Sequence, residues 1–444
     1  MNILSFFACF ETLVASVTIG QLTVIGQAIL TMTGRITMLS ISRWADKGGS
    51  YRSIQRFFST VLPWNEMFAR FFETHLFNPE HEYIVAGDET IISKAGRETF
   101  GVDRFFSGLQ GKVISGLSFF VLSLVDTAER KSYPLAVAQT VKSEAEKQAL
   151  KSRKKRETRK LKAAKGRRKG SLNRDKDELR LSSELLRISE LLSFLRKLTK
   201  PFMKLKYLAM DGHFGHNQAV LMAQANGLEL ISKLRKDAAL YEKYEGGYGG
   251  RGAPKKYGER LKYDLMPVKY LRKSEREKQI ITNYYQGLFW HKEFAKEINV
   301  VIIVKINLKT RKAGHAILFS SEVELNPEKL VDYYSLRFQI EFNFRDAKQH
   351  FGLEDFMNMT KVGVENAACL SFMMILLSTK LLKDKAEKGI GINDLKTQFR
   401  GIKYAVLTLK KVVKKPEPIL MKQIIEEVSR LGSIYQTKTT ASTA

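Results

Sequence analysis

The stretch from Asn326 to Gly352, NPEKLVDYYSLRFQIEFNFRDAKQHFG, constrains the fold of this chain more than any other. Asn326 is a favourable N-cap, Pro327 suits the first helical position, and Gly352 is typical of a residue just beyond a helix end. We therefore predict one continuous helix of about seven turns over this stretch.

Four polar side chains recur along one face of this predicted helix. They are Tyr334, Arg337, Glu341 and Lys348, at offsets of 0, 3, 7 and 14 residues. At roughly 100° per residue these offsets fall within about 60° of one another, and at about 1.5 Å per residue they form a row about 21 Å long. A carboxylate in line with two cations and a phenol suits a metal ion and a run of phosphates. The alternative is the solvated face of an amphipathic helix.

The spacing Y-x2-R-x3-E-x6-K resembles the YREK signature of the DDE transposases of bacterial insertion sequences, in the insertion-sequence-four family. The resemblance implies that Glu341 is a catalytic carboxylate. It further implies that Arg337 and Lys348 hold the phosphates beside the scissile bond and that Tyr334 hydrogen-bonds a phosphate. It requires two aspartates on strands elsewhere in the chain.

The first candidate aspartate follows the short apolar run from Tyr83 to Ala86. This run, bounded by a glycine, predicts a buried strand with Asp88 at its end. Because side chains alternate across a strand, Asp88 and Thr90 share one face and Glu89 points away. The alternative is a turn or cap residue. In the resembled family this position holds the first catalytic carboxylate, and many relatives carry a second aspartate where this chain has Glu89.

The second candidate aspartate, Asp211, ends a strand predicted over residues 206–210. The sequence GHFGH then leads into a predicted helix over 217–226 and a further strand over 228–234. This order of strand, aspartate, glycine, aromatic residue and helix resembles the second aspartate motif of the same family. His213 and His216 lack the further clustered ligands of a metal site, so we expect them to line the groove or to cap the helix.

Asp88, Asp211 and Glu341 would repel one another if they met in one site. Two divalent cations about 3.5–4 Å apart would relieve that repulsion. Oxygen ligands select hard cations, so we predict two Mg²⁺ ions, or Mn²⁺, at these three residues. They would promote in-line displacement at phosphorus, which serves both strand cleavage and strand joining.

A long segment separates the last two carboxylates, since Asp211 and Glu341 are 130 residues apart. Strand-like runs at 280–285, 300–306 and 316–320 predict a β-rich insertion here, which the resemblance also implies. Trp290 lies within it. An aromatic residue of that insertion stacks on a flipped base in relatives, so Trp290 is a candidate for base stacking. The alternative is a tryptophan of the core.

The charge of the chain points to a polyanionic partner. Lys and Arg number 74 against 46 Asp and Glu, a formal net charge of +28, which favours nucleic acid first and an anionic membrane second. The densest basic runs are KSRKKR at 151–156 and GRRKG at 166–170. They predict either an arm that neutralises DNA phosphates or a solvated linker.

The first 80 residues read as helical. The apolar segment 3–32 contains polar residues and no basic residue before it, so we expect buried helices rather than a membrane segment. Two helical patterns then flank the turn KGGS at 47–50, with Arg52, Gln55 and Arg56 on the second. This is typical of a helix–turn–helix that reads DNA, although two packed helices with exposed basic residues would give the same pattern.

The predicted fold is therefore α/β. An RNase H-like core, a mixed five-stranded sheet with helices, is interrupted by a β-rich insertion and flanked by helical regions. The predicted parts are a helical N-terminal DNA-binding domain (1–80), the first part of the core (81–236) with a basic helical insertion (141–200), the β-rich insertion (237–323), the last part of the core with the YREK helix (324–385), and a helical C-terminal region with a disordered tail (386–444).

These observations together predict a DNA transposase that cleaves transposon ends in a metal-dependent reaction and transfers the strands into target DNA. The resemblance implies a cut-and-paste route through hairpinned ends, and a homodimer that holds two terminal inverted repeats. Two cysteines, Cys9 and Cys369, imply no disulfide framework and fit a reducing interior, so we expect a bacterial cytoplasmic, nucleoid-associated protein with no membrane partner. The alternatives are a catalytically inactive, sequence-specific DNA-binding protein, another RNase H-like nuclease such as a resolvase, and a membrane-surface protein.

Overall fold

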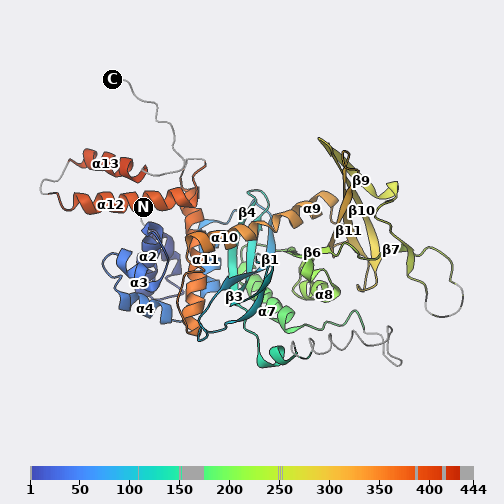
Figure 1. The fold of residues 1–444 in the computed structure, drawn as a ribbon, viewed down its shortest axis with the longest axis horizontal. Coiled ribbons are helices and arrows are strands. Elements are labelled where there is room, and N and C mark those ends of the chain that lie inside the picture. The colour runs from blue at the N-terminus through green and yellow to red at the C-terminus, as the bar shows by residue number, and fades with distance from the viewer. Residues whose placement is uncertain are drawn as a thin grey trace, which may run out of the picture.

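A mixed β-sheet runs along the protein from a helical end to a β-rich end (Figure 1). This computed structural model describes residues 3–108, 110–149, 152, 175–248, 250, 252, 254–385, 389–412 and 417–430. Within them the fold is mixed α/β, with one large sheet and many helices. Apart from Ser152, the basic runs 151–156 and 166–170 lie outside the described residues, as does the C-terminal tail.

The strands are β1 (Tyr83–Ser93), β2 (Asp103–Ser107), β3 (Lys112–Asp126), β4 (Lys131–Gln139), β5 (Tyr207–Met210), β6 (Glu229–Leu234), β7 (Leu240–Lys243), β8 (Tyr257–Arg260), β9 (Leu271–Glu277), β10 (Ile280–His291), β11 (Ile298–Asn307) and β12 (Ala313–Ser320). The helices are α1 (Leu4–Phe7), α2 (Ser16–Thr31), α3 (Met38–Trp44), α4 (Tyr51–Ser59), α5 (Trp64–His75), α7 (Ser183–Thr199), α8 (Asn217–Ala225), α9 (Pro327–Leu336), α10 (Gln339–His350), α11 (Lys361–Lys383), α12 (Ile392–Leu409) and α13 (Pro418–Arg430). Residues 144–149 are also helical.

Five strands form the centre of the sheet, in the order β4-β3-β1-β5-β6. The early strands β4, β3 and β1 pair antiparallel, and β1, β5 and β6 run parallel. Nearly all residues of β3 from 116 onward, and the first five residues of β1, are buried. Such continuous apolar runs are typical of strands covered on both faces. Helices α10 and α11 pack against β4, and α7 packs against β3 and β4.

The strands after β6 extend this central sheet instead of forming a separate one. β12 pairs antiparallel with β6, and β11, β10, β7 and β8 follow in order, with β9 beside β10. The predicted strands correspond to β10, β11 and β12. Sequence patterns missed β9, because its residues LRKSERE are almost all exposed and show no apolar alternation.

The predicted single helix over 326–352 was wrong in one respect, because it is two helices, α9 and α10, joined at Arg337 and Phe338. The Phe338 N–H donates to the Ser335 carbonyl and the Ile340 N–H donates to the Arg337 carbonyl, both at 3.1 Å. These three-residue spacings tighten the turn and interrupt the regular helical ladder. The predicted ends are confirmed: the Asn326 side chain caps α9, and Gly352 has a φ of 79° just beyond α10.

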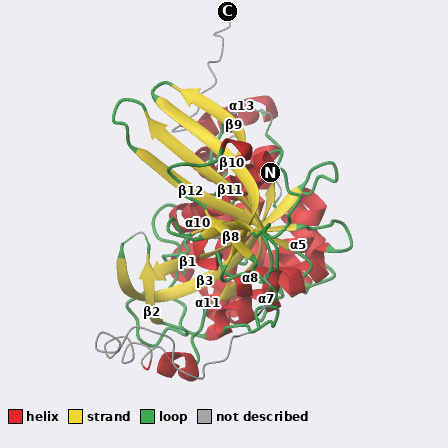
Figure 2. Ribbon diagram, turned by 90° about the vertical axis from the view of Figure 1, so that its right-hand side faces the viewer, coloured by secondary structure: helices red, strands yellow, loops and turns green. Residues whose placement is uncertain are grey.

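Two further differences concern the first strands. We predicted that the first strand ends at Asp88. Strand β1 instead continues to Ser93, because β3 pairs with it along its whole length. The segment Asp103–Ser107, for which no strand was predicted, is strand β2 and pairs with the first five residues of β3. In Figure 2 this hairpin extends away from the body of the molecule.

Helices from both ends of the chain form the helical end of the molecule, where α2 packs against α12, and α4 and α5 pack against α11 (Figure 1). The buried Asn366 side chain accepts from Trp64 Nε1 at 2.7 Å and donates to the carbonyl of Phe58 at 2.9 Å. Among the described helices, α11 is long and apolar enough to cross a membrane, but 89% of its most apolar window is buried inside the protein. We therefore interpret α11 as a core helix.

Candidate active site

The two predicted aspartates lie side by side where β1 and β5 run parallel. The last register pair of these strands is Gly87 with Met210, so Asp88 and Asp211 are the next residues on each strand. Adjacent strands are about 4.8 Å apart, and residues in register on parallel strands point to the same face. Strand pairing thus brings together Asp88 and Asp211, which are more than 100 residues apart in the sequence.

Glu341 reaches the same place from α10, which packs against β1. The connection runs through Arg337, whose Nη1 donates to Asp88 Oδ2 at 2.9 Å. Its Nη2 lies 3.7 Å from Glu341 Oε1. Asp88 Oδ1 in turn accepts from the Glu89 N–H at 2.8 Å. One guanidinium therefore contacts two of the three predicted carboxylates.

The electrostatics of Asp88 reflect this crowding of charges. Burial raises the pKa of Asp88 to about 6, opposed by Arg337 and the Glu89 N–H, with further upward contributions from Asp211 and Glu341. The anionic form of Asp88 is thus less favoured than that of a free aspartate. A bound cation would favour its ionised form, because a nearby positive charge lowers a carboxyl pKa.

An open cavity of about 900 Å³ contains all three acids. Lys348, Arg345 and His213 also line it. The three carboxylates offer only oxygen donors, which suits a hard divalent cation. This cavity therefore combines candidate metal ligands with cations that favour a phosphate backbone.

The spacing of the three acids differs from that of a compact single-ion site. Within the described part of the chain, the group whose ligand atoms all lie within 4.8 Å of one another is His81, Asp126 and Glu129, far along the strands from Asp88. In that group His81 Nδ1 already hydrogen-bonds Asp126 at 2.7 Å, and Glu129 pairs with Lys383 at 2.7 Å. Asp88, Asp211 and Glu341 do not form such a group among the described residues, so at least one pair of their ligand atoms lies more than 4.8 Å apart.

Of the remaining members of the predicted polar row, Lys348 lines this cavity, whereas Tyr334 is not among its lining residues. Tyr334 is half-buried, with its ring centroid 5.8 Å from the Arg337 guanidinium. Burial raises the pKa of Tyr334, Arg337 opposes this, and Asp211 adds to it. Lys348 Nζ donates to the carbonyl of Ile91 at 2.9 Å and lies 3.5 Å from Glu354.

Trp290 lies outside the residues that line this cavity, on β10 opposite Tyr241 of β7. Its ring makes an edge contact with Tyr257, at a centroid distance of 6.0 Å, and Lys256 Nζ lies 5.7 Å above it. Its indole nitrogen is buried and has no hydrogen-bond partner among the described residues. The ring is half-buried, and its base-stacking role stays a prediction.

Sequence reasoning missed one pair at the cavity. Glu184 comes from the first turn of α7, and its Oε2 lies 3.2 Å from Nε2 of His213. This hydrogen bond raises the pKa of His213, and the backbone N–H of His213 donates to Asp211 Oδ1 at 3.1 Å. His213 thus lines the groove, and His216 caps α8 by accepting from the Ala219 N–H. No sequence spacing could have indicated Glu184, because α7 lies outside both aspartate motifs.

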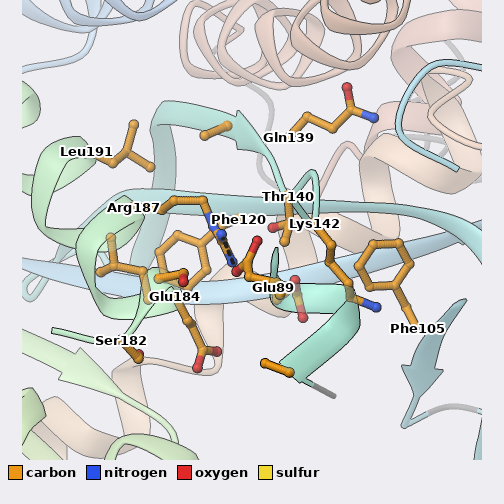
Figure 3. Close-up of a pocket in the computed structure, with 15 residues that line it drawn as sticks. Glu89, Phe105, Phe120, Gln139, Thr140, Lys142, Ser182, Glu184, Arg187 and Leu191 are labelled. Atoms are coloured by element: carbon orange, nitrogen blue, oxygen red, sulfur yellow. Dashed lines mark hydrogen bonds and ion pairs between the residues drawn. The ribbon is translucent and has the colours of Figure 1, made fainter. Parts of the chain in front are cut away.

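A second cavity, of about 440 Å³, adjoins the first (Figure 3). Glu89, Phe120 and Glu184 line both cavities. Arg187 and Glu146 both line the second cavity and form an ion pair of 2.8 Å. Glu89 therefore borders both cavities, whereas Asp88 lines only the first of the two.

The predicted recognition helix corresponds to α4, which follows α3 after the turn at 47–50. Ile54 is buried, whereas Arg52, Gln55 and Arg56 are exposed on one side of α4. The Ser50 side chain caps this helix by accepting from the Ser53 N–H. The arrangement leaves a polar face free for DNA, and its use stays a prediction.

Comparison with known proteins gives a family for most of the chain. The family model described as DDE superfamily endonuclease matches residues 6–286, a span that includes Asp88 and Asp211 and ends before Glu341. No curated protein matches the chain. Among solved structures, the chain is similar to the piggyBac transposase in a cryo-EM synaptic complex with hairpin DNA, at 11% identity and a TM-score of 0.37, over 100% of this chain and 78% of that one.

Proposed function

Because the chain belongs to the DDE superfamily endonucleases, we propose that it is a DNA transposase that cleaves transposon ends and joins them to target DNA. The observation that carries this proposal is the meeting of Asp88, Asp211 and Glu341 in one open cavity. Three acidic residues from separate parts of the chain, with cations beside them, suit phosphoryl transfer at a DNA backbone.

We also propose the finer assignment, an RNase H-like core and membership of the insertion-sequence-four group. The strand order β4-β3-β1-β5-β6, antiparallel first and parallel afterwards, supports such a core. The spacing of Tyr334, Arg337, Glu341 and Lys348 supports the YREK assignment. We also propose the domain layout, with residues 1–80 as the DNA-binding domain and 237–323 as an insertion.

In the proposed mechanism the three carboxylates hold two divalent cations, Mg²⁺ or Mn²⁺, through their oxygens. Such ions, when bound, activate a water or 3′-hydroxyl and stabilise the leaving oxygen in an in-line displacement at phosphorus. The protein's own side chains would fix the position of the DNA phosphates relative to the carboxylates. Lys348 lines the cavity, where it would position the phosphates beside the scissile bond, and the proposed role of Tyr334 is to hydrogen-bond a phosphate.

The proposed partners are double-stranded terminal inverted repeats and target DNA, bound by a homodimer that holds two ends. The net charge of +28 supports a strong, salt-dependent contact with the phosphate backbone. The proposed location is the bacterial cytoplasm, at the nucleoid.

Cleavage of a labelled duplex that carries the element's own terminal repeat tests the function. We expect the full-length protein to cut at the repeat boundary with Mg²⁺ and not with EDTA. Glu341→Ala should abolish cutting while DNA binding survives. The matched control is Glu328→Ala, because Glu328 is an exposed glutamate at the far end of the same helical segment.

Three results would contradict parts of this proposal. Binding without cutting by the unsubstituted protein would favour the inactive DNA-binding alternative. Cutting that persists in Glu341→Ala would mean that the active site lies elsewhere. Cutting that is lost equally in Glu328→Ala would show that the helical segment, rather than the carboxylate, had been disturbed.

A further inference from the structure

Arg337 occupies an unusual position for a residue expected to bind DNA. It lies at the junction of α9 and α10 and is only 5% exposed. Its guanidinium is 4.8 Å from the ring centroid of Phe338 and 5.8 Å from that of Tyr334. The side chain is therefore enclosed by the turn that interrupts the helical ladder.

The donors of this guanidinium are directed at acids of the cavity. Nη1 donates to Asp88 at 2.9 Å and Nη2 lies 3.7 Å from Glu341. Nε is buried and has no hydrogen-bond partner among the described residues. A phosphate would have to displace Arg337 from these carboxylates to bind it. The side chain of Lys348 is more accessible, at 23% exposed, and it contacts Glu354 and the Ile91 carbonyl rather than any of the three predicted metal ligands.

The planar fork of arginine suits a bridge between two carboxylates. Its nitrogens are fixed relative to one another, so two acids that contact one guanidinium are held at a set separation. Each carboxylate offers about four lone-pair sites, so acceptance from Arg337 leaves others free for a cation. The Glu89 N–H constrains the second oxygen of Asp88 in the same way.

We propose that Arg337 is a positioning residue that holds Asp88 and Glu341 in the arrangement that receives divalent cations. This inference rests on the proposed function and goes further, because it assigns Arg337 to the carboxylates instead of to the phosphates. Groups that orient metal ligands from behind typically change metal affinity by about 10–100-fold when they are removed.

Mn²⁺ binding to the full-length protein without DNA tests the proposal, with free Mn²⁺ followed by electron paramagnetic resonance. We expect Arg337→Gln to weaken Mn²⁺ binding about 10–100-fold. Arg337→Lys should not restore it, because an ammonium keeps the charge but cannot bridge two carboxylates in a fixed plane. DNA binding in EDTA should be unchanged in both variants.

The control is Arg130→Gln. Arg130 also pairs with a carboxylate of α9, Asp332, at 2.7 Å, but it is 52% exposed and lies outside the cavity. Thermal unfolding of each variant shows whether weaker Mn²⁺ binding comes from a loss of folding. If Arg337→Gln fails to fold, Mn²⁺ binding by Arg337→Lys tests the proposal instead.

Unchanged or tighter Mn²⁺ binding in both Arg337 variants would overturn the proposal. Weakened DNA binding in EDTA with normal Mn²⁺ binding would overturn it too, and would assign Arg337 to a phosphate. Mn²⁺ binding by Arg337→Lys at the unsubstituted affinity would overturn the bridging role, because it would show that a positive charge at this position is sufficient. The Mn²⁺ measurement does not depend on DNA cleavage. Its result can therefore be interpreted even if the protein proves not to be a transposase.

Discussion

Two regions of this protein were expected to act on DNA, and their side chains are arranged in opposite ways. At the junction of β1, β5 and α10, charged groups face an open cavity and contact one another across long chain separations. Around Trp290 on β10, aromatic and lysine side chains pack together and lie outside that cavity. Charged groups at strand ends leave a recognisable pattern in a sequence, whereas the same aromatic residues serve both packing and base stacking.

The largest expected effect concerns the first region. Asp211→Asn should lower the single-turnover rate of terminal-repeat cleavage in Mg²⁺ by about 10³-fold, because a metal ion contributes several kcal/mol to transition-state stabilisation. The amide oxygen can still accept from the His213 N–H, now at 3.1 Å from Oδ1, so the local fold should persist.

Asp264→Asn is the control from the second region, since Asp264 is exposed in the inserted segment. It should cleave DNA at the unsubstituted rate. An equal loss of cleavage in both variants would show that the effect is not specific to the first region. Normal cleavage by Asp211→Asn would show that Asp211 is not a catalytic residue.

The second prediction decides whether the region around Trp290 contacts DNA. If the indole stacks on a base, Trp290→Ala should weaken DNA binding by about 5–150-fold, the equivalent of about 1–3 kcal/mol per stacked base. Trp290→Phe should bind normally, because phenylalanine keeps a stacking face and removes a buried N–H that has no partner. Fluorescence anisotropy with a labelled repeat measures both.

Tyr248→Ala is the matched control, because Tyr248 is a 62% exposed aromatic residue of the same inserted segment. Normal DNA binding by Trp290→Ala, together with a lower melting temperature, would identify Trp290 as a packing residue. The two regions would then differ in function as well as in exposure.

The sequence carried enough information for the elements that hold the acids. Asn326 and Gly352 marked the outer ends of α9 and α10, and the apolar runs before Asp88 and Asp211 marked β1 and β5, because caps and apolar strands are local features. The strand β9 escaped detection because its residues are exposed and charged. The pairing of β12 with β6 is a long-range contact that no local pattern encodes.

The environment of individual side chains was least accessible from sequence. Helical periodicity put Arg337 and Lys348 on one face, yet one is buried against Asp88 and the other is partly exposed beside Glu354. That difference arises from the tightened turn between α9 and α10, which a regular periodicity of about 100° per residue does not represent. Glu184 was missed for a related reason, since only the packing of α7 brings it to His213.

The smallest expected effect sharpens the comparison within the catalytic region itself. Lys348→Gln should weaken DNA binding modestly and reduce the slope of log affinity against log salt concentration by about one, because one phosphate contact releases about one counterion. Lys309→Gln, an exposed lysine of the inserted strands, is the control and should leave the slope unchanged. Anisotropy titrations over a range of salt concentrations in EDTA measure both without any cleavage.

An unchanged slope in Lys348→Gln would mean that the bond from Lys348 to the Ile91 carbonyl is retained in the DNA complex. Lys348 would then fasten α10 to β1 from one side of Glu341, as Arg337 does from the other, and the phosphates would have to be bound by cations outside the polar row.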